Sequence, residues 1–240
     1  MFELISLGPE VHFFFNNKNP NDFYIATKSL GEQFYILPEL VLNIDSSKRI
    51  YLKDMYYSDP FYDYATDCEF KSKLNRFTED FKKNKLFIRG LILLDLINKL
   101  LNLSDLTTNG DNYGFEIPNE HLKIVDFSVQ ENKKNQKFNV YENFLSSYSV
   151  INKSSFIPLY QFINENKELK LSVAKDIVLN ELSHFKTKID KAMCLTCDFL
   201  EKNASNLFSN VENKTNVLND LNIYVENILE SFDEFLKALN

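Results

Sequence analysis

The sequence predicts an α+β fold, in which a mostly antiparallel β-sheet region with inserted helices precedes a C-terminal antiparallel helical hairpin. Two observations lead to this class. The 82 residues from Leu159 to Asn240 contain neither glycine nor proline, and their apolar residues recur at helical spacing. The first 55 residues instead contain short β-branched and aromatic runs between polar turns. We therefore expect an α+β domain over residues 1–155 and a helical region over 156–240, built mainly as a pair of long packed helices.

Strands are expected over residues 1–55. The runs Val11–Phe15 and Asp22–Ala26 flank Asn16–Asn21, a polar segment with the composition of a hairpin loop. Two more runs follow at Gln33–Leu37 and Arg49–Leu52. An antiparallel meander accommodates all four.

Helices are expected over residues 58–103. Ser58–Pro60 has the N-cap residues and early proline that begin a helix, which we extend to about Lys83. A second helix is expected from Lys85 to Leu103. Its apolar run contains Arg89 and Asp95, so it is too polar for a membrane span and is predicted to be a buried helix.

Strand character returns over residues 104–145. Thr108–Asn112 contains an Asn-Gly pair, which favours a hairpin turn. Leu122–Val129 and Lys137–Tyr141 flank the polar segment Gln130–Gln136 and predict a second hairpin, which we expect to join the first sheet.

The helical region has two apolar stripes in which positions alternate by three and four residues, the spacing of a helix–helix seam. The Asn-rich segment Asn203–Asn216 lies between them and is where we expect the chain to reverse. The first stripe contains Leu182, Phe185, Ile189, Ala192, Thr196, Phe199 and Asn203; the second contains Val211, Leu218, Leu221, Val225, Ile228, Phe232, Phe235 and Leu239. Leu200, Leu229 and Leu236 widen these stripes, so each helix is expected to contact a third surface as well.

Composition limits the classes of function. A net charge of −7, a pI near 5.1 and only three arginines argue against a nucleic-acid binder. The N-terminus lacks the features of a signal peptide, and three cysteines do not suit a disulfide scaffold. We expect a reduced cytoplasmic protein with no membrane span.

Cys194 and Cys197 form a C-x-x-C pair, which is found in redox and zinc sites. This pair falls inside an expected helix, and His184 is about 15 Å along the helix axis, too far to share a metal. The two cysteines point away from the apolar stripe, toward the face that bears Asp190, Asp198 and Glu201. Because cysteine is usually buried, we expect that helix to have a second buried face.

Other catalytic signatures are weak. Asp59, Asp63 and Asp67 would share one helix face, but acidic residues are also common near helix N-termini. Glu120 with Glu131 and Lys133 resembles a metal-dependent nuclease pattern only loosely, since Asp/Glu-x-Lys occurs six times. His12, His121 and His184 are far apart, and no glycine-rich phosphate loop is present. We predict no catalytic residue, metal or cofactor.

The sequence thus favours a non-catalytic interaction protein, a subunit or adaptor that binds another chain, either a different protein or a second copy, through its C-terminal helices. The expected partner-binding residues are Leu218, Leu221, Val225, Ile228, Phe232 and Phe235. An immunity or inhibitor protein that neutralises a basic partner is one alternative. A metal-dependent hydrolase or nuclease is the other.

Overall fold

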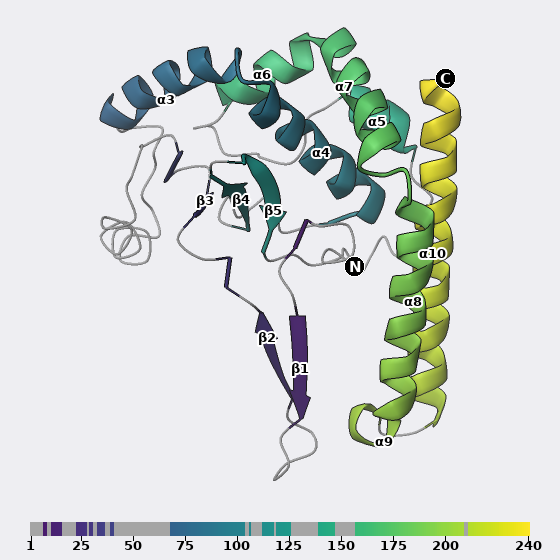
Figure 1. Ribbon diagram of the computed structural model, residues 1–240. Helices are drawn as coiled ribbons and strands as arrows, with labels where there is room; N and C mark the ends of the chain where they lie inside the picture. The colour runs from purple at the N-terminus through teal and green to yellow at the C-terminus, as the bar shows by residue number, and fades with distance from the viewer. Residues whose placement is uncertain are drawn as a thin grey trace.

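The computed structural model describes residues 7–8, 11–15, 23–27, 29–30, 33–36, 39–40, 68–103, 106, 112–117, 119–125, 139–146, 157–208 and 211–240. Over these ranges the fold is α+β, mostly helical with a small three-stranded antiparallel sheet (Figure 1). One cluster of buried apolar side chains extends from Leu7 to Leu239 and includes residues from both halves of the sequence. None of the helices described is both long and apolar enough to cross a bilayer.

The N-terminal strands form the predicted first hairpin but not the predicted meander. β1 (Val11–Phe15) and β2 (Phe23–Thr27) pair in antiparallel fashion, which confirms that hairpin. β3 (Phe34–Ile36) does not continue this sheet; it pairs with β4 (Tyr113–Glu116), so the meander is wrong at this strand. The fourth predicted strand, Arg49–Leu52, lies outside the described residues.

β4 also pairs with β5 (His121–Ile124), which gives the antiparallel order β3-β4-β5. Phe115 of β4 is fully buried and lies against the helix above the sheet at Gly90. A Cβ atom at Gly90 would lie 2.5 Å from the Phe115 ring, so a glycine inside this helix allows the sheet to approach closely.

The predicted buried helix is α4 (Lys85–Leu101), and residues on every face of it are buried. The side chain of Asn84 caps it by accepting hydrogen bonds from the backbone N–H groups of Leu86 and Phe87. The helix ends at Asn102, whose φ of 50° is the left-handed conformation that asparagine tolerates. The preceding α3 (Cys68–Phe81) matches the later part of the helix predicted up to Lys83; residues 58–67 lie outside the described ranges.

The strand predicted over Lys137–Tyr141 is wrong at its end, because α5 (Val140–Ser146) is a helix. Asn139 accepts a hydrogen bond from the Glu142 backbone N–H and so caps the first turn. Phe144 is fully buried against α10, and this tertiary contact favours the helix over the strand propensity of the local sequence.

The stretch after Pro158 contains more helices than the pair of long ones expected. They are α6 (Ile157–Glu165), α7 (Lys167–Asn180), α8 (Phe185–Lys202), α9 (Ala204–Leu207) and α10 (Val211–Leu239). The helical run is interrupted at Asn166, between α6 and α7, although no glycine or proline is present. The Asn166 side chain donates a hydrogen bond to the Phe162 carbonyl. The breaks let α6 pack on α3, α7 on α4 and α8 on α10.

α8 and α10 lie side by side, and their contacts run in antiparallel order (Figure 1). Phe185 at the start of α8 lies against Phe232 near the end of α10, with ring centroids 4.7 Å apart. Glu201 at the end of α8 forms a 2.5 Å ion pair with Lys214 at the start of α10. Burial ends at Ala192 in α8 and begins at Val225 in α10. Between these limits we define the distal arm as residues 193–208 and 211–224; none of its described side chains is buried.

Candidate functional site

The predicted partner-binding residues of α10 lie mainly inside the chain's own core. Val225, Ile228, Phe232 and Phe235 are all less than 9% exposed. Leu221 is partly buried against the same core, and Leu218 is half-buried. The stripe that looked available for a partner is therefore largely covered by α4, α5 and α8.

Apolar exposure is concentrated instead on the distal arm. Leu195 is 54% exposed, Val211 is 80% exposed, and Val217 and Ile223 are also exposed. A two-helix arm covers only one side of each helix, so apolar residues beside the seam stay in contact with water. The distal arm can therefore offer apolar side chains of α8 and α10 to another chain.

The two cysteines of α8 also lie on the distal arm. Cys194 is exposed and Cys197 is half-buried, and neither is in a disulfide. The predicted second buried face is thus wrong at Cys194, because no described residue packs on that side of α8 at this level. Asp190, Asp198 and Glu201 on the same side are likewise exposed.

The residues considered for metal or acid–base chemistry are not brought together. Glu120 lies in the β4–β5 turn, where its carboxylate accepts a 2.9 Å hydrogen bond from Asn84. His121 and His184 are exposed, and His12 lies in β1. Within the described ranges no group of three or more His, Cys, Asp or Glu side chains is placed to hold a metal ion. Asp59, Asp63, Asp67, Glu131 and Lys133 lie outside those ranges.

The strongest electrostatic feature is a buried charge cluster that the sequence analysis missed. Asp95 of α4 is fully buried, with Lys99 Nζ 2.7 Å from Oδ1 and Lys170 Nζ of α7 2.9 Å from Oδ2. The contact with Lys170 is an ion pair without hydrogen-bond alignment at Oδ2. Lys170 also donates to the Phe144 carbonyl of α5 and lies over the Phe144 ring, 4.3 Å from its centroid.

This cluster joins three helices but is not an accessible reaction centre. Lys170 is 1% exposed, so no substrate can reach it without opening α4, α5 and α7. Because two ammonium groups share one carboxylate, Asp95 offsets part of the cost of burying both positive charges. The cluster therefore links the three helices within the core.

We expect stability at alkaline pH to report on Lys99. Burial lowers its pKa below the ordinary value of 10.5; Asp95 opposes this shift and the charge of Lys170 adds to it. Between the lowered pKa and 10.5 the unfolded chain binds more protons at Lys99 than the folded chain, so the Lys99 contribution to stability rises with pH. Urea unfolding of wild type and Lys99→Met from about pH 8 to pH 11 measures the difference in their free energies of unfolding, which is expected to rise with pH. A difference that stays flat or falls with pH contradicts the assignment.

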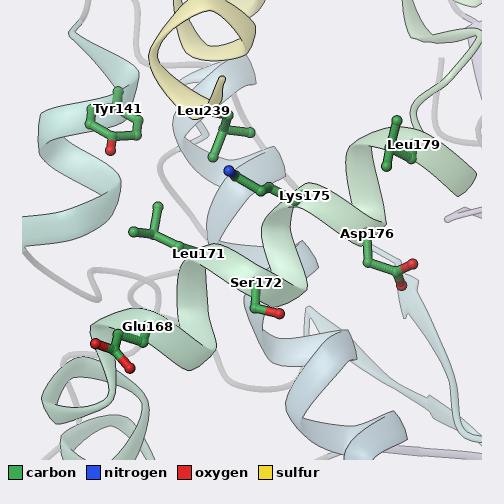
Figure 2. A pocket seen from close by; sticks show the side chains of 8 residues that line it. All are labelled: Tyr141, Glu168, Leu171, Ser172, Lys175, Asp176, Leu179 and Leu239. Carbon is green, nitrogen blue, oxygen red and sulfur yellow. The ribbon is translucent and has the colours of Figure 1, made fainter.

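A surface groove lies between α5, α7 and the end of α10, with a volume of about 560 Å³ (Figure 2). We call it the α7 groove. Its lining mixes apolar and charged side chains: Tyr141, Glu168, Leu171, Ser172, Lys175, Asp176, Leu179 and Leu239. Lys175 reaches toward Leu239 across the groove, whereas Asp176 extends away from both and pairs with Arg89 (Figure 2).

Part of the buried charge cluster can be recognised in the sequence, but the α7 groove cannot. Asp95 and Lys99 stand four residues apart within an apolar run, which is a signal for a buried intrahelical pair. Lys170 has no such signal, because it is one of several lysines in a polar-looking segment. The α7 groove depends on how α5 and α10 meet α7, which no local pattern contains.

Comparison with known proteins adds no relative. No protein-family model, no curated protein and no solved structure matches this chain.

Proposed function

We propose that this protein is a non-catalytic interaction protein, a subunit or adaptor of a larger intracellular assembly that docks through its C-terminal helices. The observation that carries the proposal is the distal arm, where Leu195, Val211, Val217 and Ile223 are exposed on helices whose other ends are anchored in the core. Val211, Val217 and Ile223 are six residues apart and point in different directions around α10, so a chain that buries them contacts the arm from more than one side. Of the six residues first expected to bind, only Leu218 and Leu221 belong to this arm.

The arm residues are expected to matter for binding and not for folding. We expect Leu195→Asp or Ile223→Asp to lower recovery of a copurifying protein about tenfold, because each places a charge in an apolar contact. The measurement is quantitative mass spectrometry of proteins bound to the tagged chain in its source cell. Leu86→Asp is the matched control, since Leu86 is 51% exposed, close to the 54% of Leu195, but lies at the start of α4. Equal recovery with wild type and both arm variants would argue against docking through the arm.

An immunity or inhibitor protein for a basic partner is the second candidate. Glu226, Glu230 and Glu234 are exposed and spaced four residues apart, so they share one face of α10. Such a face attracts a basic protein by charge complementarity. Complex formation through it weakens strongly with salt, whereas docking through the apolar arm changes little.

A further inference from the structure

α7 departs from the usual distribution of polarity at two residues, Lys170 and Leu179. Its inner face buries Lys170 together with Ala174 and Ile177, while Leu179 on the outside is 73% exposed. A helix on the surface of a protein ordinarily places its apolar residues inward and its charges outward. The ion pair with Asp95 explains why Lys170 is buried. Among the described residues, no contact with the core explains why Leu179 is a leucine, since its side chain points outward.

One row of exposed residues follows the α7 groove. Glu168, Ser172, Lys175 and Leu179 are spaced by four, three and four residues, so they form one helix face about 16 Å long. Within the described residues, neither Glu168 nor Lys175 forms an ion pair or hydrogen bond. The row thus offers an acid and a base two turns apart, beside the apolar wall of Leu171, Leu239 and Tyr141.

A second row with the same spacing lies on α8. Lys191, Leu195, Asp198 and Lys202 are all exposed and are also separated by four, three and four residues. Its base comes first and its acid follows two turns later, the reverse of the charge order on α7. Its three charged side chains likewise have no ion pair or hydrogen bond within the part of the chain that the structure describes.

We propose that the α8 row of a second copy of this chain docks, parallel to α7, in the α7 groove. This alignment places Lys191 opposite Glu168 and Asp198 opposite Lys175. Leu195 then faces the apolar wall of the groove, and the aliphatic stem of Lys202 covers Leu179. The opposite order of charges on two rows of equal spacing makes a second copy a complementary occupant of the groove.

The contact is head-to-tail, because different surfaces of the two copies meet. Two rows of this length bury less than the roughly 800 Å² per partner of a stable interface, so the self-association is weak. The inference rests on the proposed function in one respect, since Leu195 belongs to the distal arm.

Sedimentation analysis of the pure full-length chain, from about 10 μM to about 1 mM, tests the proposal. Wild type is expected to self-associate with increasing concentration. Lys175→Glu and Asp198→Lys each weaken the association at least about fivefold, because attraction becomes repulsion. The double variant K175E/D198K restores it. An equimolar mixture of the two single variants is expected to associate as well, because the α8 row of each variant is complementary in charge to the groove of the other.

Lys83→Glu and Asp80→Lys, at two exposed positions around the end of α3, are the matched controls and are expected to leave the association unchanged. Thermal unfolding of each variant verifies that it folds. A wild-type chain that stays monomeric throughout the concentration range overturns the proposal, as does a dimer that neither single variant weakens. If the pure chain is monomeric while Leu195→Asp still abolishes copurification, only the second copy is excluded and docking through the arm stands.

Discussion

Replacing Asp95 with asparagine is expected to lower the free energy of unfolding by about 3 to 5 kcal/mol. The variant keeps the size of the side chain but leaves Lys99 and Lys170 in the core without their carboxylate. Losing one partner of a buried ion pair is more destabilising than losing a surface pair, because the remaining charge cannot be solvated. Urea unfolding followed by circular dichroism, with the m value held equal, measures the change.

Asn98 provides a matched control on the same helix. It is 5% exposed, and no donor faces its Oδ1 atom among the described residues. Asn98→Leu is therefore expected to be neutral or stabilising, since it removes an unsatisfied buried carbonyl. A loss below about 1 kcal/mol for Asp95→Asn would mean that the two lysines find other partners or lose their protons.

The contribution of the buried charge cluster to stability can be tested separately from its effect on how the helices pack. Replacing Asp95, Lys99 and Lys170 together with leucine and methionine removes all three charges at once, and buried ion networks replaced in this way often leave stability unchanged or higher. In this protein the charges link three helices, because Lys170 of α7 pairs with Asp95 of α4 and donates to the Phe144 carbonyl of α5. Polar groups that must all be satisfied together favour one arrangement of the helices over close alternatives.

Elements defined by local chemistry could be predicted from the sequence. The run from Leu86 to Leu101 is apolar over more than four turns, so α4 follows from it directly. The β1–β2 hairpin follows from two aromatic runs around the polar loop at Asn16–Asn21. Both cases need only neighbouring residues, which is why the pattern was sufficient.

The remaining features depend on residues far apart in the chain. The strand prediction over Lys137–Tyr141 rested on aromatic and β-branched residues, whereas α5 packs Phe144 against Phe235, which comes 91 residues later. The spacing of the apolar stripe of α10 predicts that other residues cover it. It does not indicate whether those residues belong to this chain or to a partner. Long-range packing provides that cover for Val225 to Leu239 and leaves the distal arm without it.

Replacing Phe235 with alanine is expected to lower the free energy of unfolding by about 3 to 5 kcal/mol. Phe235 is fully buried, and its ring centroid lies 5.5 Å from that of Phe144 and 6.1 Å from that of Tyr141. Removing the ring leaves a cavity between α10 and α5, and α5 in turn holds the carbonyl that accepts from Lys170. The measurement is urea unfolding at neutral pH.

Ile223→Ala, on the same helix, is the matched control for Phe235→Ala. Ile223 is 40% exposed on the distal arm, so Ile223→Ala is expected to change stability by less than about 1 kcal/mol while weakening partner binding. Phe235→Ala is expected to do the opposite, affecting binding only in proportion to the unfolded fraction. If Phe235→Ala instead leaves stability intact and abolishes binding, then the end of α10 leaves α5 to meet its partner. In that case the predicted stripe from Leu218 to Phe235 is the docking surface after all.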